Sequence, residues 1–225
     1  MAMTQTLLTS DGTATGATSF TTASITPTGY RVIIVGVANR DGTTAEPTVS
    51  GCGISWTKID TQNYFTNGYQ TSLFWGMAPN PSTGTLTIDY GAQTPTAALW
   101  IVTQLTEVDV YDPIVQSVEV GIDGNASSIT VTLAAFASAD NGTIGMIGSE
   151  GVGFSIDNGA GFTEIAEEGF FDTTIGMMEF NAGNDTSVDA SSSNATSHKW
   201  GGIAVELNFN DKPPTSGGAF LMNFV

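Results

Sequence analysis

Short runs rich in Val, Ile, Thr, Phe and Trp, separated by turn residues, recur along the whole chain and constrain its fold more than any other feature. About a dozen such runs have the length and composition of β-strands. Dipeptides that favour tight turns lie between them, among them Asp41-Gly42, Asn67-Gly68 and Asn141-Gly142. Signals for helices are nearly absent. We therefore predict an all-β protein, a jelly-roll-like antiparallel β-sandwich.

A weak internal duplication accompanies this pattern. Three motifs recur in the same order, 102 to 106 residues further on: SIT (24–26, 128–130), ISWTKI and GFTEI (54–59, 161–165), and IVTQL and IAVEL (101–105, 203–207). The spacing predicts two pseudo-repeats, at about residues 19–109 and 123–209. They can form tandem sandwiches or interlock into one two-sheet domain. We favour interlocking, because residues 110–127 lack the composition of a linker.

The two ends of the chain differ from the predicted sandwich. Residues 1–18 form an N-terminal segment, and residues 210–225 combine a Pro- and Gly-containing linker with an apolar C-terminal arm. Such an arm either folds back on its own sandwich or docks on another chain, and we favour docking. The expected docking side chains are Phe220, Leu221, Met222, Phe224 and Val225.

The charge balance excludes several partners. Five basic residues against 22 acidic ones give a formal net charge of −17. Proteins bind nucleic acid mainly through Lys and Arg, so we expect no nucleic-acid partner, and anionic membrane surfaces are disfavoured for the same reason. Cys52 is the single cysteine, which rules out an internal disulfide and a multi-thiolate metal site.

Candidate catalytic residues are few. His198 is the single histidine, it lies in a polar run, and no Gly-x-Ser-x-Gly motif accompanies it. Two carboxylates would suffice for glycoside hydrolysis, and a cluster of five glutamates lies in the second half, where Phe170 and Phe171 are nearby. These are Glu150, Glu164, Glu167, Glu168 and Glu179. Paired acids in a loop are usually solvated, so we assign no catalytic residue and do not expect an enzyme.

Two weaker ligand signals remain. Asn184, Asp185 and Asp189 offer oxygen atoms of the kind that calcium prefers, but their spacing is not that of an EF-hand and turn formation explains them better. We expect no cofactor, with calcium as the alternative. Tyr64, Phe65 and Tyr69 surround a predicted turn and are the best candidates for an exposed aromatic ligand loop.

The order of several motifs resembles a family of jelly-roll-type virion proteins of phages and prophages. The resemblance rests on SITP (24–27), VIIV (32–35), GISWT (53–57), SLFWGMA (72–78), GTLTI (84–88) and LTEVDVYDPI (105–114). It runs from about Ser19 to Leu207, and this chain has Glu107 where the family usually has Gly. It is a pattern of strands and turns, without a catalytic signature.

The resemblance implies a non-enzymatic virion structural protein, a capsid decoration (cement) or minor capsid protein on the outside of a phage particle. Its partners would be the major capsid protein or other virion proteins, and a homo-oligomer, with a trimer favoured, is expected. Assembly in the host bacterial cytoplasm agrees with the lone cysteine. The alternative is a carbohydrate- or receptor-binding module of a tail fibre or spike.

Overall fold

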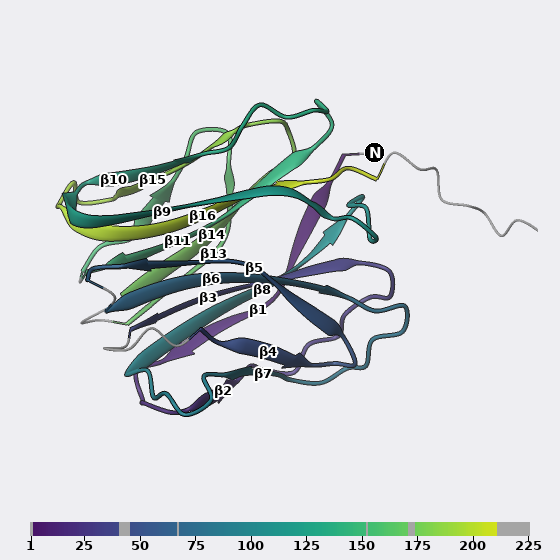
Figure 1. The fold of residues 1–225 in the computed structure, drawn as a ribbon, viewed down its shortest axis with the longest axis horizontal. Helices are drawn as coiled ribbons and strands as arrows, with labels where there is room; N and C mark the ends of the chain where they lie inside the picture. The colour runs from purple at the N-terminus through teal and green to yellow at the C-terminus, as the bar shows by residue number, and fades with distance from the viewer. Residues whose placement is uncertain (1, 41–45, 67, 152, 171–173, 211–225) are drawn as a thin grey trace, which may run out of the picture.

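The structure is a computed structural model that describes residues 2–40, 46–66, 68–151, 153–170 and 174–210. These residues form sixteen strands in four antiparallel sheets, and no helix long and apolar enough to cross a bilayer occurs among them. The sheets are stacked as four layers, with two five-stranded sheets inside and a three-stranded sheet on each outer side (Figure 1). The predicted all-β sandwich architecture is confirmed.

The first half of the chain builds one two-sheet sandwich. Its five-stranded sheet has the order β1-β8-β3-β6-β5, and its three-stranded sheet has the order β2-β7-β4. The strands are β1 (Thr4–Thr13), β2 (Ser19–Thr21), β3 (Val32–Arg40), β4 (Thr48–Gly51), β5 (Ser55–Tyr64), β6 (Tyr69–Met77), β7 (Leu86–Asp89) and β8 (Ala97–Thr106). This is the strand order of an eight-stranded jelly roll with one difference. β5 pairs with β6 in the five-stranded sheet, whereas in a jelly roll the fifth strand extends the other sheet, next to the fourth strand.

The second half repeats this plan strand for strand. Its two sheets have the orders β9-β16-β11-β14-β13 and β10-β15-β12. These are the orders of the first half with eight added to each strand number. The strands are β9 (Ile114–Ala126), β10 (Ser128–Thr132), β11 (Gly142–Glu150), β12 (Ile156–Asn158), β13 (Thr163–Phe170), β14 (Thr174–Asn181), β15 (Ser187–Ser192) and β16 (His198–Leu207).

The strand register shows the duplication residue by residue. Thr57 lies opposite Trp75, and Thr163 lies opposite Phe180, so the second sequence echo falls on equivalent positions. Both strands then bulge at the same place, after Lys58 in β5 and after Glu164 in β13. A bulge at equivalent positions supports the duplication strongly, because bulges are specific local features of a strand pair.

The other two echoes differ in how well they align. Ile101 and Ile203 occupy equivalent places in β8 and β16. Ile25 does not match Ile129, because Ile25 forms an isolated bridge to Gly84 outside β2, whereas Ile129 lies within β10 opposite Ala190. The duplication is therefore present, although one of the three motifs that predicted it is out of register.

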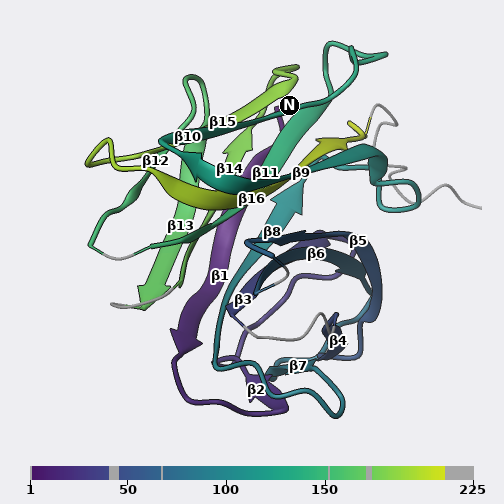
Figure 2. The same ribbon diagram turned by 60° about the vertical axis from the view of Figure 1, so that its left-hand side comes forward.

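The halves pack face to face through their five-stranded sheets. β1 lies against β13, while β9, the counterpart of β1, lies against β5, the counterpart of β13. In the same way β3 packs on β14 and β11 packs on β6 (Figure 2). This reciprocal pattern is that of an isologous two-fold interface, here formed within one chain.

Three buried clusters hold the layers together. The central cluster contains side chains from both halves, such as Ile34 and Leu99 from the first and Met146 and Val205 from the second. The other two fill the individual sandwiches. Burial of apolar area at about 25 cal/mol per Å² is the main stabilising term in such layers. The central cluster therefore joins the two sandwiches through a shared apolar core.

Two boundary predictions were wrong. Residues 1–18 are not outside the sandwich, because β1 is an edge strand of the first sheet, and residues 110–122 contain the start of β9. The preference for one interlocked two-sheet domain was also wrong, since each half pairs its own strands into separate sheets and the halves meet face to face, with hydrogen bonds such as that from Oγ of Ser117 to Oδ2 of Asp60 at 2.9 Å. The stretch at 110–127 lacks linker composition because it is a strand. The predicted arm, residues 211–225, lies outside the described residues.

Candidate functional site

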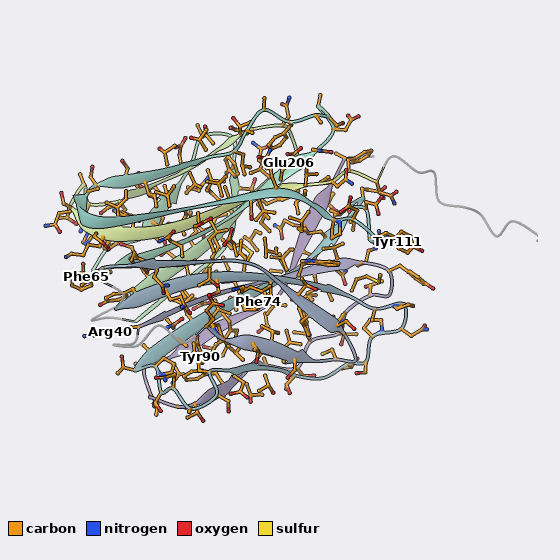
Figure 3. The ribbon with its side chains drawn as sticks, viewed as in Figure 1. Arg40, Phe65, Phe74, Tyr90, Tyr111 and Glu206 are labelled. Atoms are coloured by element: carbon orange, nitrogen blue, oxygen red, sulfur yellow. The ribbon has the colours of Figure 1, made fainter. Side chains whose placement is uncertain are left out.

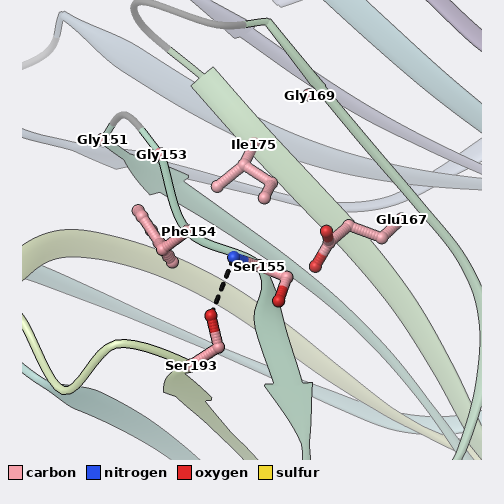
Figure 4. Close-up of a pocket in the computed structure, with 8 residues that line it drawn as sticks. All are labelled: Gly151, Gly153, Phe154, Ser155, Glu167, Gly169, Ile175 and Ser193. Carbon is pink, nitrogen blue, oxygen red and sulfur yellow. Dashed lines mark hydrogen bonds between the residues drawn. The ribbon is translucent and has the colours of Figure 1, made fainter.

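A cavity of about 480 Å³ opens beside the second sandwich (Figure 4). It lies between the segment that joins β11 to β12, the strands β13 and β14, and the loop after β15. We call it the Glu167 cavity. Its walls are Gly151, Gly153, Phe154, Ser155, Glu167, Gly169, Ile175 and Ser193. This volume is in the range of small-molecule sites, which are mostly apolar with a few placed polar groups.

Two loops form one side of the cavity and are tied together by their backbones. The amide of Ser155 donates to Oγ of Ser193 at 3.0 Å, and the amide of Ser193 donates to the carbonyl of Ser155, also at 3.0 Å. The Ser193 hydroxyl and the backbone of Ser155 are therefore held in place beside the cavity.

Phe154 is held by two rings of β16. His198 stacks on it with ring centroids 3.9 Å apart and planes 15° apart, and Trp200 meets it edge-on at 6.0 Å. Trp200 is fully buried and donates its indole N–H to the carbonyl of Ala126 at 2.8 Å. His198, expected in a polar loop, instead begins β16 and supports the aromatic wall of the cavity, with Oγ1 of Thr196 in contact with its Nε2.

Glu167 supplies the charge of the cavity. Its Oε2 accepts the backbone N–H of Ile156, and its carboxylate points into the space lined by Ser155 and Ile175 (Figure 4). Burial raises the pKa of Glu167, and the charges of Glu164, Asp157 and Glu168 raise it further, while the Ile156 N–H opposes them. A half-buried carboxylate among other acids favours a positively charged partner.

Glu164 shares a sheet face with Glu167 because of the bulge in β13. Glu164 lies opposite Glu179, and Glu167 lies opposite Met177, two positions apart on β14. Residues two apart on a strand point to the same side of a sheet. Glu168 belongs to the other face. The structure thus brings together two of the five glutamates named from the sequence, although Glu164 is exposed and does not line the cavity.

The remaining two glutamates of that group have structural surroundings. Glu150 forms an ion pair with Lys199 at 3.4 Å. Glu179 is fully buried in the second sandwich, where its Oε2 accepts the Gly159 N–H at 3.1 Å and its Oε1 has no hydrogen-bond partner. Burial, with smaller contributions from the charges of Asp189 and Asp185, raises the pKa of Glu179 to about 8. Glu179 is therefore mostly protonated at neutral pH.

The calcium candidates lie in a turn and on the neighbouring strand β15. Asp185 accepts the Ser187 amide at 3.0 Å, which is a turn contact, and Asn184 is exposed. Asp189 lies on β15 opposite Thr130. Within the described ranges, no group of three or more His, Cys, Asp or Glu side chains is arranged to hold a metal ion. The turn interpretation accounts for Asp185.

The expected exposed aromatic loop is mostly buried. Tyr64 is 1% exposed and Tyr69 is 5% exposed, while Phe65 between them is half-buried. Tyr64 packs between the halves against Gly201, where an added Cβ would lie 2.2 Å from the ring. Arg40 lies over the Tyr69 ring and, like Phe65, at the same end of the molecule (Figure 3). The expectation of exposure was wrong for Tyr64 and Tyr69, because the second half covers them.

The sequence interpretation missed most of the cavity. It named Glu167 as one acid of a group and His198 as a loop residue, but it did not identify Phe154, Ser155, Ile175 or Ser193. These four come from three segments, with Phe154 and Ser155 adjacent, and only the fold brings the segments together. A sequence signal for the cavity was present in residues 151–155, where two glycines are followed by an aromatic residue and a serine. The predicted docking residues 220–225 and the aromatic residue 171 lie outside the described residues, as does the side chain of Phe170.

Comparison with protein-family models, with curated proteins and with solved structures finds no match to this chain. The class of protein is therefore defined by its fold, a duplicated jelly-roll-like β-sandwich with a small acidic cavity in its second half.

Proposed function

We propose that this protein is a non-enzymatic virion structural protein, a decoration or minor capsid protein that docks on the outside of a phage particle. One structural observation carries the proposal: a four-layered body presents a three-stranded sheet on each of its two opposite sides (Figure 1), with Ser and Thr at the exposed positions of β2, β4 and β10. Jelly rolls are a recurrent architecture of capsid and lectin domains. The resemblance to phage virion proteins points in the same direction.

The outer sheets alternate buried apolar residues with exposed short polar ones. The exposed members on three of these strands are Ser19, Thr21, Thr48, Ser50, Ser128, Thr130 and Thr132. Ser and Thr have few rotamers to lose, so ordering them against a neighbour costs less free energy than ordering Lys or Glu. Such faces are suited to docking on other virion proteins, the major capsid protein among them.

The net charge supports an exterior position. A chain with a formal net charge of −17 is repelled by packaged nucleic acid and remains soluble at high concentration before assembly. We extend the proposal to a homo-oligomer, with a trimer favoured, because virion components assemble by symmetry. The apolar arm, with Phe220, Leu221, Met222, Phe224 and Val225, is proposed to dock on a neighbouring subunit.

A binding experiment with particles tests the proposal. Purified protein should bind in a fixed ratio to particles that lack it and should raise their melting temperature. A variant that ends at residue 218 should keep the sandwich folded but bind far fewer copies. If the full chain neither cosediments with particles nor changes their melting temperature, the structural role is rejected. Normal binding of the shortened chain would reject the arm alone.

A second function, a carbohydrate- or receptor-binding module of a tail fibre or spike, is favoured by the Glu167 cavity. Structural proteins that act only by docking do not need a small-molecule cavity with a charged wall. In this case the protein should bind host cells, and Glu167→Gln should reduce that binding, while particle stability should not change. The two functions therefore give opposite results in the two assays.

A further inference from the structure

We propose that the Glu167 cavity binds a primary ammonium group at the end of an alkyl chain. A lysine side chain of a partner protein and a free aliphatic amine both carry this group. The inference rests on the walls of the cavity and holds whether or not the protein belongs to a virion.

The first argument is the unpaired acid. None of the ion pairs in the described part of the chain involves Glu167, since Lys58 pairs with Glu46 and Lys199 pairs with Glu150. The charges of Asp157, Glu164 and Glu168 act on the same carboxyl group. A concave site lined by one sign of charge concentrates ions of the opposite sign. The cavity therefore selects cations over neutral or anionic ligands.

The second argument is the number and type of polar atoms. An ammonium group has three N–H donors and no acceptor. The cavity offers the Glu167 carboxylate and the hydroxyls of Ser155 and Ser193, all of which can accept hydrogen bonds. Oγ of Ser193 already accepts the Ser155 amide, so its position is fixed before a ligand arrives. Three acceptor groups thus match three donors.

The third argument separates ammonium from guanidinium. A guanidinium group binds a carboxylate best through two parallel hydrogen bonds, one to each oxygen. Oε2 of Glu167 is already engaged by the Ile156 N–H, which leaves the carboxylate poorly arranged for that fork. A compact ammonium charge needs no such pairing.

The fourth argument concerns the alkyl chain. Ile175, which is 7% exposed, and Phe154 form an apolar wall facing the carboxylate (Figure 4). His198 stacks on Phe154 and fixes its ring. Methylene groups can pack on Ile175 while the cation lies near both the ring and the acid, an arrangement that aromatic rings favour.

The test is a titration of the full chain followed by amide chemical shifts. The probes are N-acetyl-lysine methylamide, its arginine and norleucine counterparts, and spermidine as a free amine. We expect the lysine amide or spermidine to shift the amides of Gly153, Ser155 and Gly169. The arginine probe should bind more weakly, and the uncharged norleucine probe should cause no shift. Binding by spermidine alone would support the proposal with a free amine as the source.

Two variants and one control make the result specific. Glu167→Gln should weaken binding about tenfold or more, the scale of losing a hydrogen bond to a charged group. Glu168→Gln removes the same charge from the other face of β13 and should change binding far less. Ser155→Tyr keeps the charge, replaces an exposed side chain and should block the cavity. Equal binding by wild type and both cavity variants, or no shift with either amine, would overturn the proposal.

Discussion

The two halves of the chain share one plan of eight strands but fill their cores differently. At equivalent positions of β6 and β14, the first half has Phe74, and the second half has Glu179. Both residues lie in the interior of their own sandwich, and both are buried, at 3% and 0% exposed. The fold therefore tolerates opposite chemistry at one core position, provided that the strand alternation and the turns are kept.

The surroundings of these two residues explain the tolerance. Phe74 belongs to an aromatic-rich core with Phe20 and Trp100, whose rings lie 6.2 Å apart. Glu179 receives the Gly159 N–H, and its raised pKa keeps it neutral near pH 7. A neutral carboxyl costs far less to bury than a charged one. The second half thus holds an acid that the first half has no means to accommodate.

Replacing the buried aromatic residue of the first half by an acid should have the largest effect on stability. Phe74→Glu should lower the free energy of unfolding by about 4 kcal/mol or more, because it removes core packing and buries an acid without a partner. Urea unfolding measures this loss. Thr57→Glu, on the exposed side of β5, is the control and should change stability by less than about 1 kcal/mol. A loss below that level for Phe74→Glu would contradict the comparison.

In the second half the corresponding effect should depend on pH. Burial raises the pKa of Glu179 in the folded protein to about 8, from the ordinary value of 4.5 for glutamate. Between these values the folded protein holds a proton that the unfolded chain has released, so the Glu179 contribution to stability decreases as pH rises and levels off above about 8. The difference between wild type and Glu179→Gln should change by a few kcal/mol, about 5 at most, over this range. A difference that does not change with pH would show that Glu179 is not held neutral by the fold.

The contact between the halves gives a third prediction. Gly201→Ala would place a Cβ 2.2 Å from the Tyr64 ring, which is enclosed between β5 and the second half. We expect a loss of roughly 1–3 kcal/mol, the usual cost of overpacking. Gly124→Ala adds the same methyl group in β9, where nothing lies within 4 Å, and serves as the control. Equal stability of the two variants would mean that the halves are less closely packed at Tyr64.

The smallest effects concern the ion pairs. Lys58 and Glu46 are 41% and 49% exposed, so Lys58→Gln should cost about 0–0.5 kcal/mol. Lys199 pairs with Glu150 at lower exposure and lies 4.1 Å from the centre of the Phe65 ring, across the two halves. Lys199→Gln should therefore cost more, about 1 kcal/mol. Thermal unfolding at low and high salt distinguishes them, and a larger effect at Lys58 would reverse the expected order.

The strand pattern could be predicted from the sequence because alternation and turn residues are local signals. The duplication could be detected because two pairs of equivalent strands keep local sequence similarity. These pairs are β5 with β13, which share a bulge, and β8 with β16. The strand signal at residues 114–120 predicted the first part of β9, whereas β1 and the later part of β9 were missed, because these edge strands have mostly half-exposed residues and a weak alternation. Their role depends on pairing with β8 and β16, which no local signal shows.

The cavity and the buried aromatic residues could not be predicted for a related reason. Phe154, Glu167 and Ser193 meet only because β12, β13 and β15 converge, and Tyr64 is buried only because β16 lies over it. The burial of Glu179 was hidden as well, since its neighbours in sequence are typical of a strand at a sheet surface or in a core. Long-range packing decides these surroundings, and the sequence signals that we used are local.

Electron cryo-microscopy of the intact phage particle tests the central claim most directly. We predict density for this chain on the outer surface, with two jelly-roll-like sandwiches stacked through their five-stranded sheets and one hydroxyl-rich outer sheet against a neighbouring virion protein. Absence of the chain from the particle, or a position in the interior against the genome, would contradict the proposed role.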